Sequence, residues 1–381
     1  MSSVCILTHQ FFRSRGERRS IGGVETYISA LIELLVDNGN HITVLQTAEI
    51  AFEHKLSDHV LVIGVPGDLD SLKSFYGKSH RGKHSLTIFA LFNIADCCLG
   101  ERSVAIQHGI NFDGFNSGAP PSLLPLVRLR RVFQLRKIKK QARRVVESID
   151  RIICVDTNFI NWMRAEFPFQ RWDEKLFYVP NFGDPITRKE LSEKRRRDGS
   201  SLRILIARRF EPFRGVLVMA EIIRSIARQY PHCHFIFAGK GPLEDEVRTQ
   251  LDGIANCEIT SIAYEDMMAA CYNTDISVVP TIYCEGTSLA CVEGLCAGNA
   301  VLATNSGGLC NLILPEYNGL LVQPTREALR DGLVRLLDDM SLRVRLGDRG
   351  HETAVECFSR DKWKQRVESV LAFAAGSESN G

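Results

Sequence analysis

At 381 residues the chain is long for one hydrophobic core, and two domains of roughly 150–190 residues are expected. An apolar fraction of 45% and a charged fraction of 24% are those of an ordinary globular protein, and a net charge of +2 gives no global field for nucleic acid. The twelve cysteines show no paired metal-type spacing, which favours free core thiols over a disulfide framework. The N-terminal apolar run is too short for a signal peptide and no apolar run of about 20 residues occurs, so a cytoplasmic protein, at most held on a membrane surface, is expected.

The first half opens with short apolar runs separated by helical patterns. Residues 4–8 predict a strand, Gly22 and Gly23 a turn, residues 24–35 a helix, and residues 42–45 a second strand. This order is the opening of a doubly wound parallel sheet, in which ligands lie beyond the carboxyl ends of the strands. The two glycines therefore stand where a backbone can approach a phosphate, although such a pair is more often only a turn.

Two further patterns in this half carry chemistry. His108 follows a predicted strand over residues 103–107, which makes it a candidate catalytic or substrate-binding imidazole, although His9 and His41 also lie near strand ends. Asp68 and Asp70 form a D-x-D, a pattern used elsewhere to hold a metal on a nucleotide sugar. No other ligand-type residues cluster with them after the Pro-Gly turn, so a solvated loop is favoured.

The segment Arg128–Arg144 contains nine Lys or Arg residues and no acid. Apolar residues recur along it at helical spacing, which predicts a helix packed on the sheet. Its basic faces are either solvated or rest on anionic lipid headgroups. The single sign of the charge keeps both interpretations open.

The strand-helix pattern restarts after residues 187–201, which are charged and end in a Gly-Ser run. They predict a linker between one domain over residues 1–186 and another over residues 202–357. Residues 358–381 contain an amphipathic helix that is expected to cross back to the first domain. The predicted class is α/β, with two Rossmann-like doubly wound parallel-sheet domains facing each other across a cleft.

The stretch 280–322 organises the second half, and it carries two carboxylates, Glu285 and Glu293, eight positions apart. On one helix this spacing places both on one face, about 12 Å apart, which suits an extended polyhydroxylated ligand better than a metal ion. The intervening turn, Gly286-Thr287-Ser288, begins a helix whose free N–H groups form an anion site.

Arg208 and Arg214 follow the predicted strand over residues 202–207 and are expected on the same side of the second domain. Two fixed guanidinium groups suit a diphosphate, because Arg gives bidentate and always charged contacts to phosphate oxygens. With the two carboxylates they predict a nucleotide-sugar site that needs no metal.

These motifs resemble glycosyltransferase family 4, the retaining nucleotide-sugar transferases with the two-domain GT-B fold. The resemblance covers nearly the whole chain and its motifs occur in family order. They are Gly22-Gly23, His108, Val179-Pro180-Asn181, Arg208, Arg214-Gly215, residues 237–242, Asp275 to Pro280, Glu285-x7-Glu293, Ala297-Gly298, Ser306-Gly307-Gly308 and residues 318–322. The chain departs from the family at Arg214, where Lys is usual, and at Ala207, where Gly is usual.

By matching position, the resemblance implies a role for each of these residues. Glu285 would contact the donor sugar hydroxyls, Glu293 the ribose, and Arg208 and Arg214 the diphosphate. The remaining implied contacts are backbone amides of Gly286, Thr287, Ser288 and Leu289 to phosphate or sugar, Gly22 and Gly23 near the donor phosphates, and His108 near the reactive face of the sugar.

The expected activity is retaining transfer from a UDP- or GDP-type nucleotide sugar to a hydroxyl acceptor, without metal or cofactor. A lipid-linked or glycan acceptor, in cell-envelope, exopolysaccharide or glycolipid synthesis, follows if the basic segment binds a membrane. Two alternatives remain open: a nucleotide-sugar epimerase on the same fold, and a non-catalytic subunit that binds a partner transferase. An epimerase would convert the donor without an acceptor, and a non-catalytic subunit would bind no nucleoside diphosphate.

Overall fold

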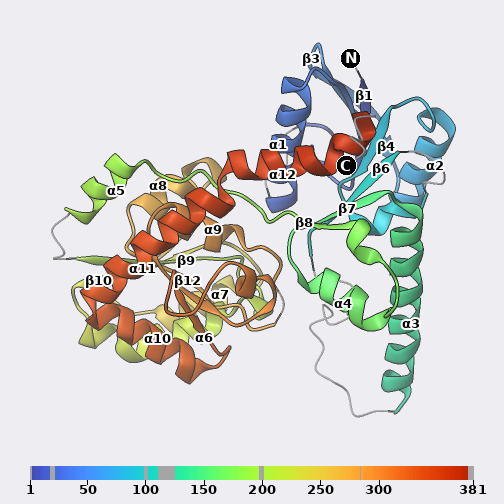
Figure 1. Cartoon of the computed structure of the whole chain (residues 1–381). Helices are drawn as coiled ribbons and strands as arrows, with labels where there is room; N and C mark the ends of the chain where they lie inside the picture. The colour runs from blue at the N-terminus through green and yellow to red at the C-terminus, as the bar shows by residue number, and fades with distance from the viewer. Residues whose placement is uncertain are drawn as a thin grey trace. The chain divides into compact units, whose positions relative to one another are not determined.

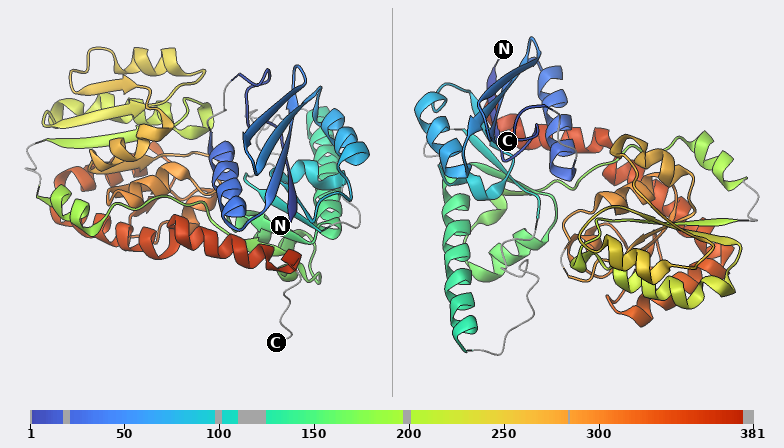
Figure 2. Two further views of the ribbon diagram at one scale, coloured as in Figure 1. Left: turned by 90° about the horizontal axis from the view of Figure 1, so that it is seen from above. Right: turned by 180° about the vertical axis from the view of Figure 1, so that it is seen from behind.

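The computed structural model describes residues 2–17, 22–97, 102–109, 125–196, 201–283 and 285–375, with the backbone alone for 125–132 and 374–375 (Figure 1). The chain divides into two compact units: unit 1, Met1–Val179 with Lys364–Gly381, and unit 2, Pro180–Trp363. Each unit is a β-sheet with helices on both faces (Figure 2), which confirms the predicted α/β class. The division after Val179 lies seven residues before the predicted boundary at residue 186.

Unit 1 is built on an eight-stranded sheet of order β3-β4-β2-β1-β5-β6-β7-β8. Adjacent strands of this sheet are parallel, except that β3 is antiparallel to β4. Central β1 reads as a continuous apolar run because both of its faces are covered. The strands are β1 (Ser3–Thr8), β2 (His41–Ala48), β3 (Phe52–Ser57), β4 (Val60–Pro66), β5 (Leu86–Phe89), β6 (Ser103–Gln107), β7 (Arg151–Cys154) and β8 (Leu176–Tyr178).

The helices of unit 1 follow the predicted strands. They are α1 (Gly23–Asp37), α2 (Leu69–Ser79), η1 (Phe92–Cys97), α3 (Pro125–Ser148), α4 (Asn158–Glu166) and η3 (Trp172–Glu174). The D-x-D motif begins α2: the Asp68 carboxylate accepts the backbone N–H of Ser71 at 2.9 Å, which caps the helix. Asp68 therefore has a structural explanation.

Unit 2 is built on a six-stranded, all-parallel sheet of order β11-β10-β9-β12-β13-β14. Its strands are β9 (Leu202–Ala207), β10 (Cys233–Ala238), β11 (Cys257–Thr260), β12 (Ile276–Val279), β13 (Ala300–Thr304) and β14 (Leu320–Val322). Alternate residues of β13 enter different cores: Leu302 packs with α6 and α10, and Val301 packs with α9. The helices are α5 (Arg188–Arg195), η4 (Pro212–Arg214), α6 (Val216–Ile226), η5 (Ala227–Gln229), α7 (Glu244–Leu251), η6 (Tyr264–Asp266), α8 (Met267–Tyr272), α9 (Leu289–Cys296), η7 (Gly307–Asn311), α10 (Arg326–Asp338), α11 (Met340–Thr353) and η8 (Ala354–Phe358).

The predicted linker, residues 187–201, is wrong over its first part, where the structure has helix α5. Thr187 and Glu190 form a capping box at its start. Lys194 is buried, and its ammonium donates to the carbonyl oxygens of Ala297 at 2.9 Å and Cys271 at 3.2 Å. The charged residues that suggested a solvated linker thus have partners about a hundred residues away in sequence, which local composition does not reveal.

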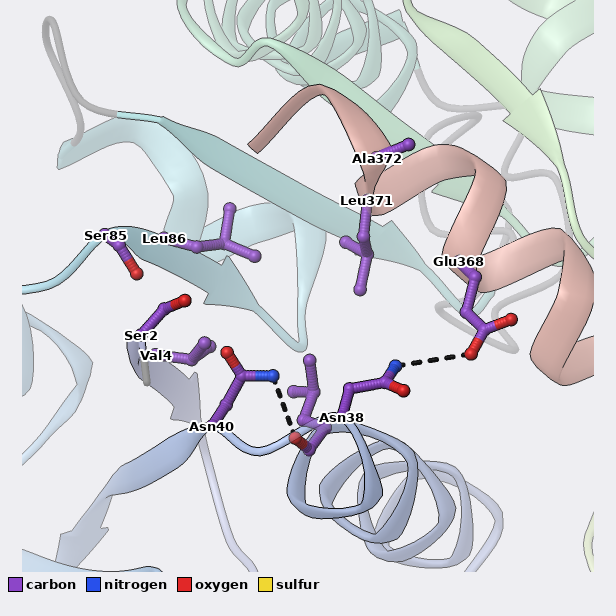
Figure 3. A pocket seen from close by; sticks show the side chains of 10 residues that line it. Ser2, Val4, Asn38, Asn40, Ser85, Leu86, Glu368, Leu371 and Ala372 are labelled. Carbon is purple, nitrogen blue, oxygen red and sulfur yellow. Dashed lines mark hydrogen bonds between the residues drawn. The ribbon is translucent and has the colours of Figure 1, made fainter. Parts of the chain in front are cut away.

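Helix α12 (Arg360–Leu371), followed by η9 (Ala372–Ala375), belongs to unit 1 from Lys364 onward. There Asn38, after α1, donates to Glu368 at 3.2 Å, and a pocket of about 390 Å³ opens beside them (Figure 3). Ser2, Val4 and Leu86 place this pocket at the amino ends of β1 and β5. Ligands of parallel sheets bind at the opposite, carboxyl ends, so this pocket is not the expected site.

Candidate active site

Two neighbouring strands of unit 2 bring the predicted cations and carboxylate together. Strand β9 pairs with β12, and Arg208 directly follows β9, while Pro280 and Thr281 follow β12. Because parallel strands end at the same edge of a sheet, the two segments meet beyond their carboxyl ends. The predicted gathering of Arg208, Arg214 and Glu285 in unit 2 is what the structure shows.

The Glu285 carboxylate is the centre of this cluster. Its Oε2 accepts a hydrogen bond from Arg214 Nη1 at 2.5 Å and from Thr281 Oγ1 at 2.7 Å, and it also pairs with Arg208 Nη2. All three contacts fall on one oxygen. In the described part of the chain no donor engages Oε1, which is therefore the oxygen left for a ligand hydroxyl.

Arg208 is buried and is held by hydroxyl groups as well as by Glu285. Its Nη2 donates to Thr281 Oγ1 at 2.8 Å and its Nη1 to Ser288 Oγ at 3.0 Å. Its buried Nε finds no acceptor among the described residues. Arg214 is the more accessible cation, with 25% of its side chain exposed against 6% for Arg208.

Burial by itself raises the pKa of the Glu285 carboxyl, but Arg208 and Arg214 together outweigh it and hold that pKa below its ordinary value. Glu285 is therefore ionised at neutral pH. The cluster of two guanidinium groups and one carboxylate keeps one net positive charge, which complements an anionic ligand.

The turn Gly286-Thr287-Ser288 links Glu285 to helix α9, whose first residue is Leu289. Ser288 is the N-cap residue, but its hydroxyl accepts from Arg208 and does not cap the helix. The first backbone N–H groups of α9 have no partner within the helix, and the anion site expected there stays a prediction. The expectation that Glu285 and Glu293 share one helical face is wrong, because Glu285 lies in the loop before α9.

Glu293 lies within α9 and is buried. Burial raises the pKa of its carboxyl to about 7, against the opposing effect of Arg208. A carboxyl at this value changes charge near neutral pH. A ligand hydroxyl that donates to it would favour the ionised form.

One side chain and one backbone N–H outside the predicted site residues fix the loop that carries Glu285. The Asn181 amide donates to the carbonyl oxygen of Thr287 at 2.9 Å, and Gly308 N–H donates to the carbonyl oxygen of Glu285 at 2.8 Å. Thr281 also belongs to the cluster and was not among the predicted site residues. Its place four residues before Glu285 and directly after a strand was the available signal, but hydroxyl residues at strand ends are too common to single one out.

The predicted residues of unit 1 also gather at the carboxyl ends of strands. His108 directly follows β6, and its ring contacts Tyr27 of α1 edge to face, with centroids 4.9 Å apart. Helix α1 begins at Gly23, so Gly22, Gly23 and His108 belong to one region of unit 1. Burial lowers the pKa of His108 to about 4, and its buried Nε2 finds no partner in the described ranges. His108 is therefore a neutral imidazole at neutral pH. It can form hydrogen bonds but does not carry a positive charge.

A parallel-sheet domain with paired arginines, a central carboxylate and a helix N-terminus at its strand ends suits an anionic ligand. The family description "Glycosyl transferases group 1" matches residues 187–353. An uncharacterized glycosyltransferase of Methanocaldococcus jannaschii is 23% identical over 92% of this chain and 94% of its own length. One subunit of the human phosphatidylinositol N-acetylglucosaminyltransferase is 23% identical over 88% of this chain and 68% of its own length. Residues 187–353 therefore match the glycosyl transferases group 1, and the protein is a glycosyl-transferring enzyme.

Solved structures show the same fold. Sucrose-phosphate synthase from Thermosynechococcus elongatus has a TM-score of 0.76 at 16% identity, with 99% of this chain and 100% of that chain covered. HepE of Anabaena, in complex with UDP and glucose, has a TM-score of 0.68 at 15% identity, with 98% and 100% covered. The fold is therefore GT-B, as predicted.

Proposed function

We propose that this enzyme transfers a sugar from a nucleoside diphosphate donor of the UDP or GDP type to a hydroxyl acceptor, with retention of the anomeric configuration. The observation that carries the proposal is the cluster of Arg208, Arg214 and Glu285 beside the N-terminus of α9. Two fixed cations and free N–H groups suit a leaving diphosphate. The HepE complex with UDP supports a uridine donor in particular.

In this proposal the arginines stabilise the charge that develops on the diphosphate, so that no metal is required at the site. Glu285 places its free Oε1 toward the sugar hydroxyls, while its Oε2 is engaged by three donors. A carboxylate held in this way is a poor nucleophile. Retention in this proposal instead requires that the acceptor hydroxyl approach the sugar from the face that the diphosphate leaves.

Nucleoside diphosphates and nucleotide sugars, screened by thermal shift, test the proposal. The preferred donor is expected to raise Tm most, because a ligand at a hundred times its Kd adds about 2.7 kcal/mol to folding stability. Transfer to a lipid-linked or glycan acceptor, followed by NMR of the new anomeric centre, then reports the stereochemistry. Absence of any nucleotide binding, conversion of the donor without an acceptor, or an inverted product would each contradict the proposal.

Affinity for the nucleoside diphosphate is expected to rise about tenfold from pH 6 to pH 8, if Glu293 holds the ribose. With a pKa of about 7 the Glu293 carboxyl is mostly protonated at pH 6 and mostly ionised at pH 8, and only the ionised form accepts both ribose hydroxyls. Calorimetry on the wild-type chain and the Glu293→Gln variant measures this. The diphosphate of the ligand titrates equally in the two experiments, so the difference between the two pH profiles of affinity reports Glu293 alone. If the two profiles coincide, Glu293 does not bind the ribose.

We also propose that α3 rests on an anionic membrane surface, where a lipid-linked acceptor would be found. Seen along the helix, exposed Phe133 shares one face with exposed Lys137, Lys140 and Arg144, opposite the buried Ala142, Val145 and Val146. No described residue pairs with these three cations, whereas Lys139 and Arg143 pair with Glu166 and Glu147. The phosphatidylinositol named in the human relative supports a lipid acceptor. Among the described residues no helix is both long and apolar enough to span a membrane.

Sedimentation with phosphatidylserine vesicles tests this surface. The Lys137→Glu/Lys140→Glu variant is expected to bind at least about tenfold more weakly than the wild type at low salt, at about 1 kcal/mol per basic residue. The matched control reverses two exposed charges of unit 2, Lys189 and Arg228, and is expected to bind normally. Equal binding by the two variants would leave the basic face as a solvated one.

A further inference from the structure

Three metal-ligand side chains meet in unit 1, away from the residues assigned to sugar transfer. They are Cys5 of β1, His80 at the end of α2, and His84 in the loop before β5. One ligand atom from each residue lies within 4.8 Å of the other two. Cys5 is buried, and the two histidines are half-buried.

The fold brings these residues together from three separate elements. Helix α2 ends at Ser79, and the N–H of its C-cap residue His80 donates to Tyr76. The chain then turns back, and Ser85 N–H donates to the carbonyl oxygen of Ser3 at 2.8 Å. This contact places His84 beside the start of β1, where Ser3 and Cys5 share one face because they are two positions apart.

The His84 ring is oriented in the way that metal-binding histidines usually are. Its Nδ1 lies 2.7 Å from Ser3 Oγ, and its Nε2 lies 3.2 Å from His80 Nδ1. If the Nδ1–H of His84 donates to Ser3, the Nε2 lone pair is on the side of His80 and Cys5. In many metal sites a hydrogen bond of this kind, from the nitrogen that does not bind the metal, fixes the tautomer of the ligand.

We propose that Cys5, His80 and His84 bind a Zn²⁺ ion. With Zn–N and Zn–S bonds of about 2.0 and 2.3 Å, a tetrahedral site needs nitrogen atoms about 3.3 Å apart and a sulfur about 3.5 Å from each. The two imidazole nitrogens stand 3.2 Å apart in nearly parallel rings, so both rings have to turn toward a shared ion and the thiol has to approach it. A thiolate with two imidazoles favours Zn²⁺ over the hard ions Mg²⁺ and Ca²⁺.

Binding converts the Cys5 thiol to a thiolate and releases its proton, and a water takes the fourth position. The ion would join β1, the end of α2 and the loop before β5. These lie toward the amino end of β1, whereas Gly22, Gly23 and His108 follow strand ends. The inference is therefore independent of the proposed sugar transfer, and it concerns the folding and stability of unit 1.

Cobalt substitution tests the site on the full-length chain after chelator treatment. One equivalent of Co²⁺ is expected to produce a thiolate-to-metal charge-transfer band in the near ultraviolet and intense visible bands of a tetrahedral ion, which one equivalent of Zn²⁺ removes. Cys5→Ser should abolish the charge-transfer band, and His84→Gln should weaken binding at least about tenfold. Two variants serve as controls, and both should bind cobalt normally. Cys154→Ser removes another buried thiol, in β7. His59→Gln disrupts another histidine pair, because the rings of His59 and His41 lie 4.8 Å apart, and no thiol joins this pair in a ligand cluster among the described residues.

X-ray absorption at the zinc edge uses the wild-type chain alone, so misfolding of a variant cannot affect the result. One sulfur and two imidazole nitrogens in the coordination shell are expected. A shell without sulfur, the absence of stoichiometric binding, or a charge-transfer band that persists in Cys5→Ser would overturn the proposal. The histidines would then be only a hydrogen-bonded pair beside a core thiol.

Discussion

Replacing Arg214 with alanine is expected to lower kcat by on the order of 10²-fold or more. A cation fixed beside a leaving diphosphate contributes about 3 kcal/mol to the transition state, and each 1.4 kcal/mol changes the rate tenfold. Arg214 is the better of the two arginines to replace, because it is partly exposed and its loss should disturb folding less. Removing the buried Arg208 would also leave Glu285 without its closest partner and would lower stability as well as rate.

Arg209→Ala is the matched control for this experiment. Arg209 lies on the same loop and carries the same charge, but 76% of its side chain is exposed and it pairs with Glu211 at 2.9 Å. Its turnover is expected within about twofold of the wild type, since an exposed ion pair contributes little. Arg214→Lys should recover part of the loss, because it restores the charge without the bidentate fork. Near-wild-type turnover of Arg214→Ala would remove Arg214 from the diphosphate.

Much of this site was accessible from the sequence because parallel strands end at one edge of a sheet. The strand patterns alone were enough to place Arg208 directly after the strand over residues 202–207. They also placed Glu285 shortly after the strand that ends in Pro280. That Glu285 binds both arginines through one oxygen was not predictable. It depends on the order of β9 and β12 in the sheet and on the conformation of the loops after them, which local patterns do not encode.

The errors of prediction share one physical cause, which is that partners distant in sequence decide the outcome. The charged residues of α5 indicated a linker, yet Arg195 donates to the carbonyl oxygen of Gly298 at 2.8 Å and pairs with Asp348 at 2.9 Å. The proposed zinc ligands illustrate the same limit, because Cys5 lies 75 residues before His80. Spacing rules find metal ligands only where the ligands are close in sequence.

A single glycine supports the geometry of the candidate site in unit 2. Gly215 follows Arg214 and precedes α6, with φ at +72°, where residues with a side chain are strained. A Cβ atom there would lie 1.9 Å from the carbonyl oxygen of Pro280, the residue that links β12 to Thr281. The loop that carries Arg214 therefore reaches the Glu285 segment only because residue 215 has no side chain.

Gly215→Ala is expected to reduce both stability and turnover strongly. The left-handed conformation alone costs about 1–2 kcal/mol, and contact with the Pro280 carbonyl forces the two loops apart and moves Arg214 from Glu285. Gly253→Ala separates these effects, because Gly253 has φ at +75° but nothing within 4 Å of the added Cβ. Circular dichroism melting and steady-state kinetics on both variants measure the difference. Gly253→Ala should lower Tm modestly and leave kcat unchanged, whereas Gly215→Ala should lower Tm further and reduce kcat at least about tenfold. If the two variants behave alike, the close approach to Pro280 does not position Arg214.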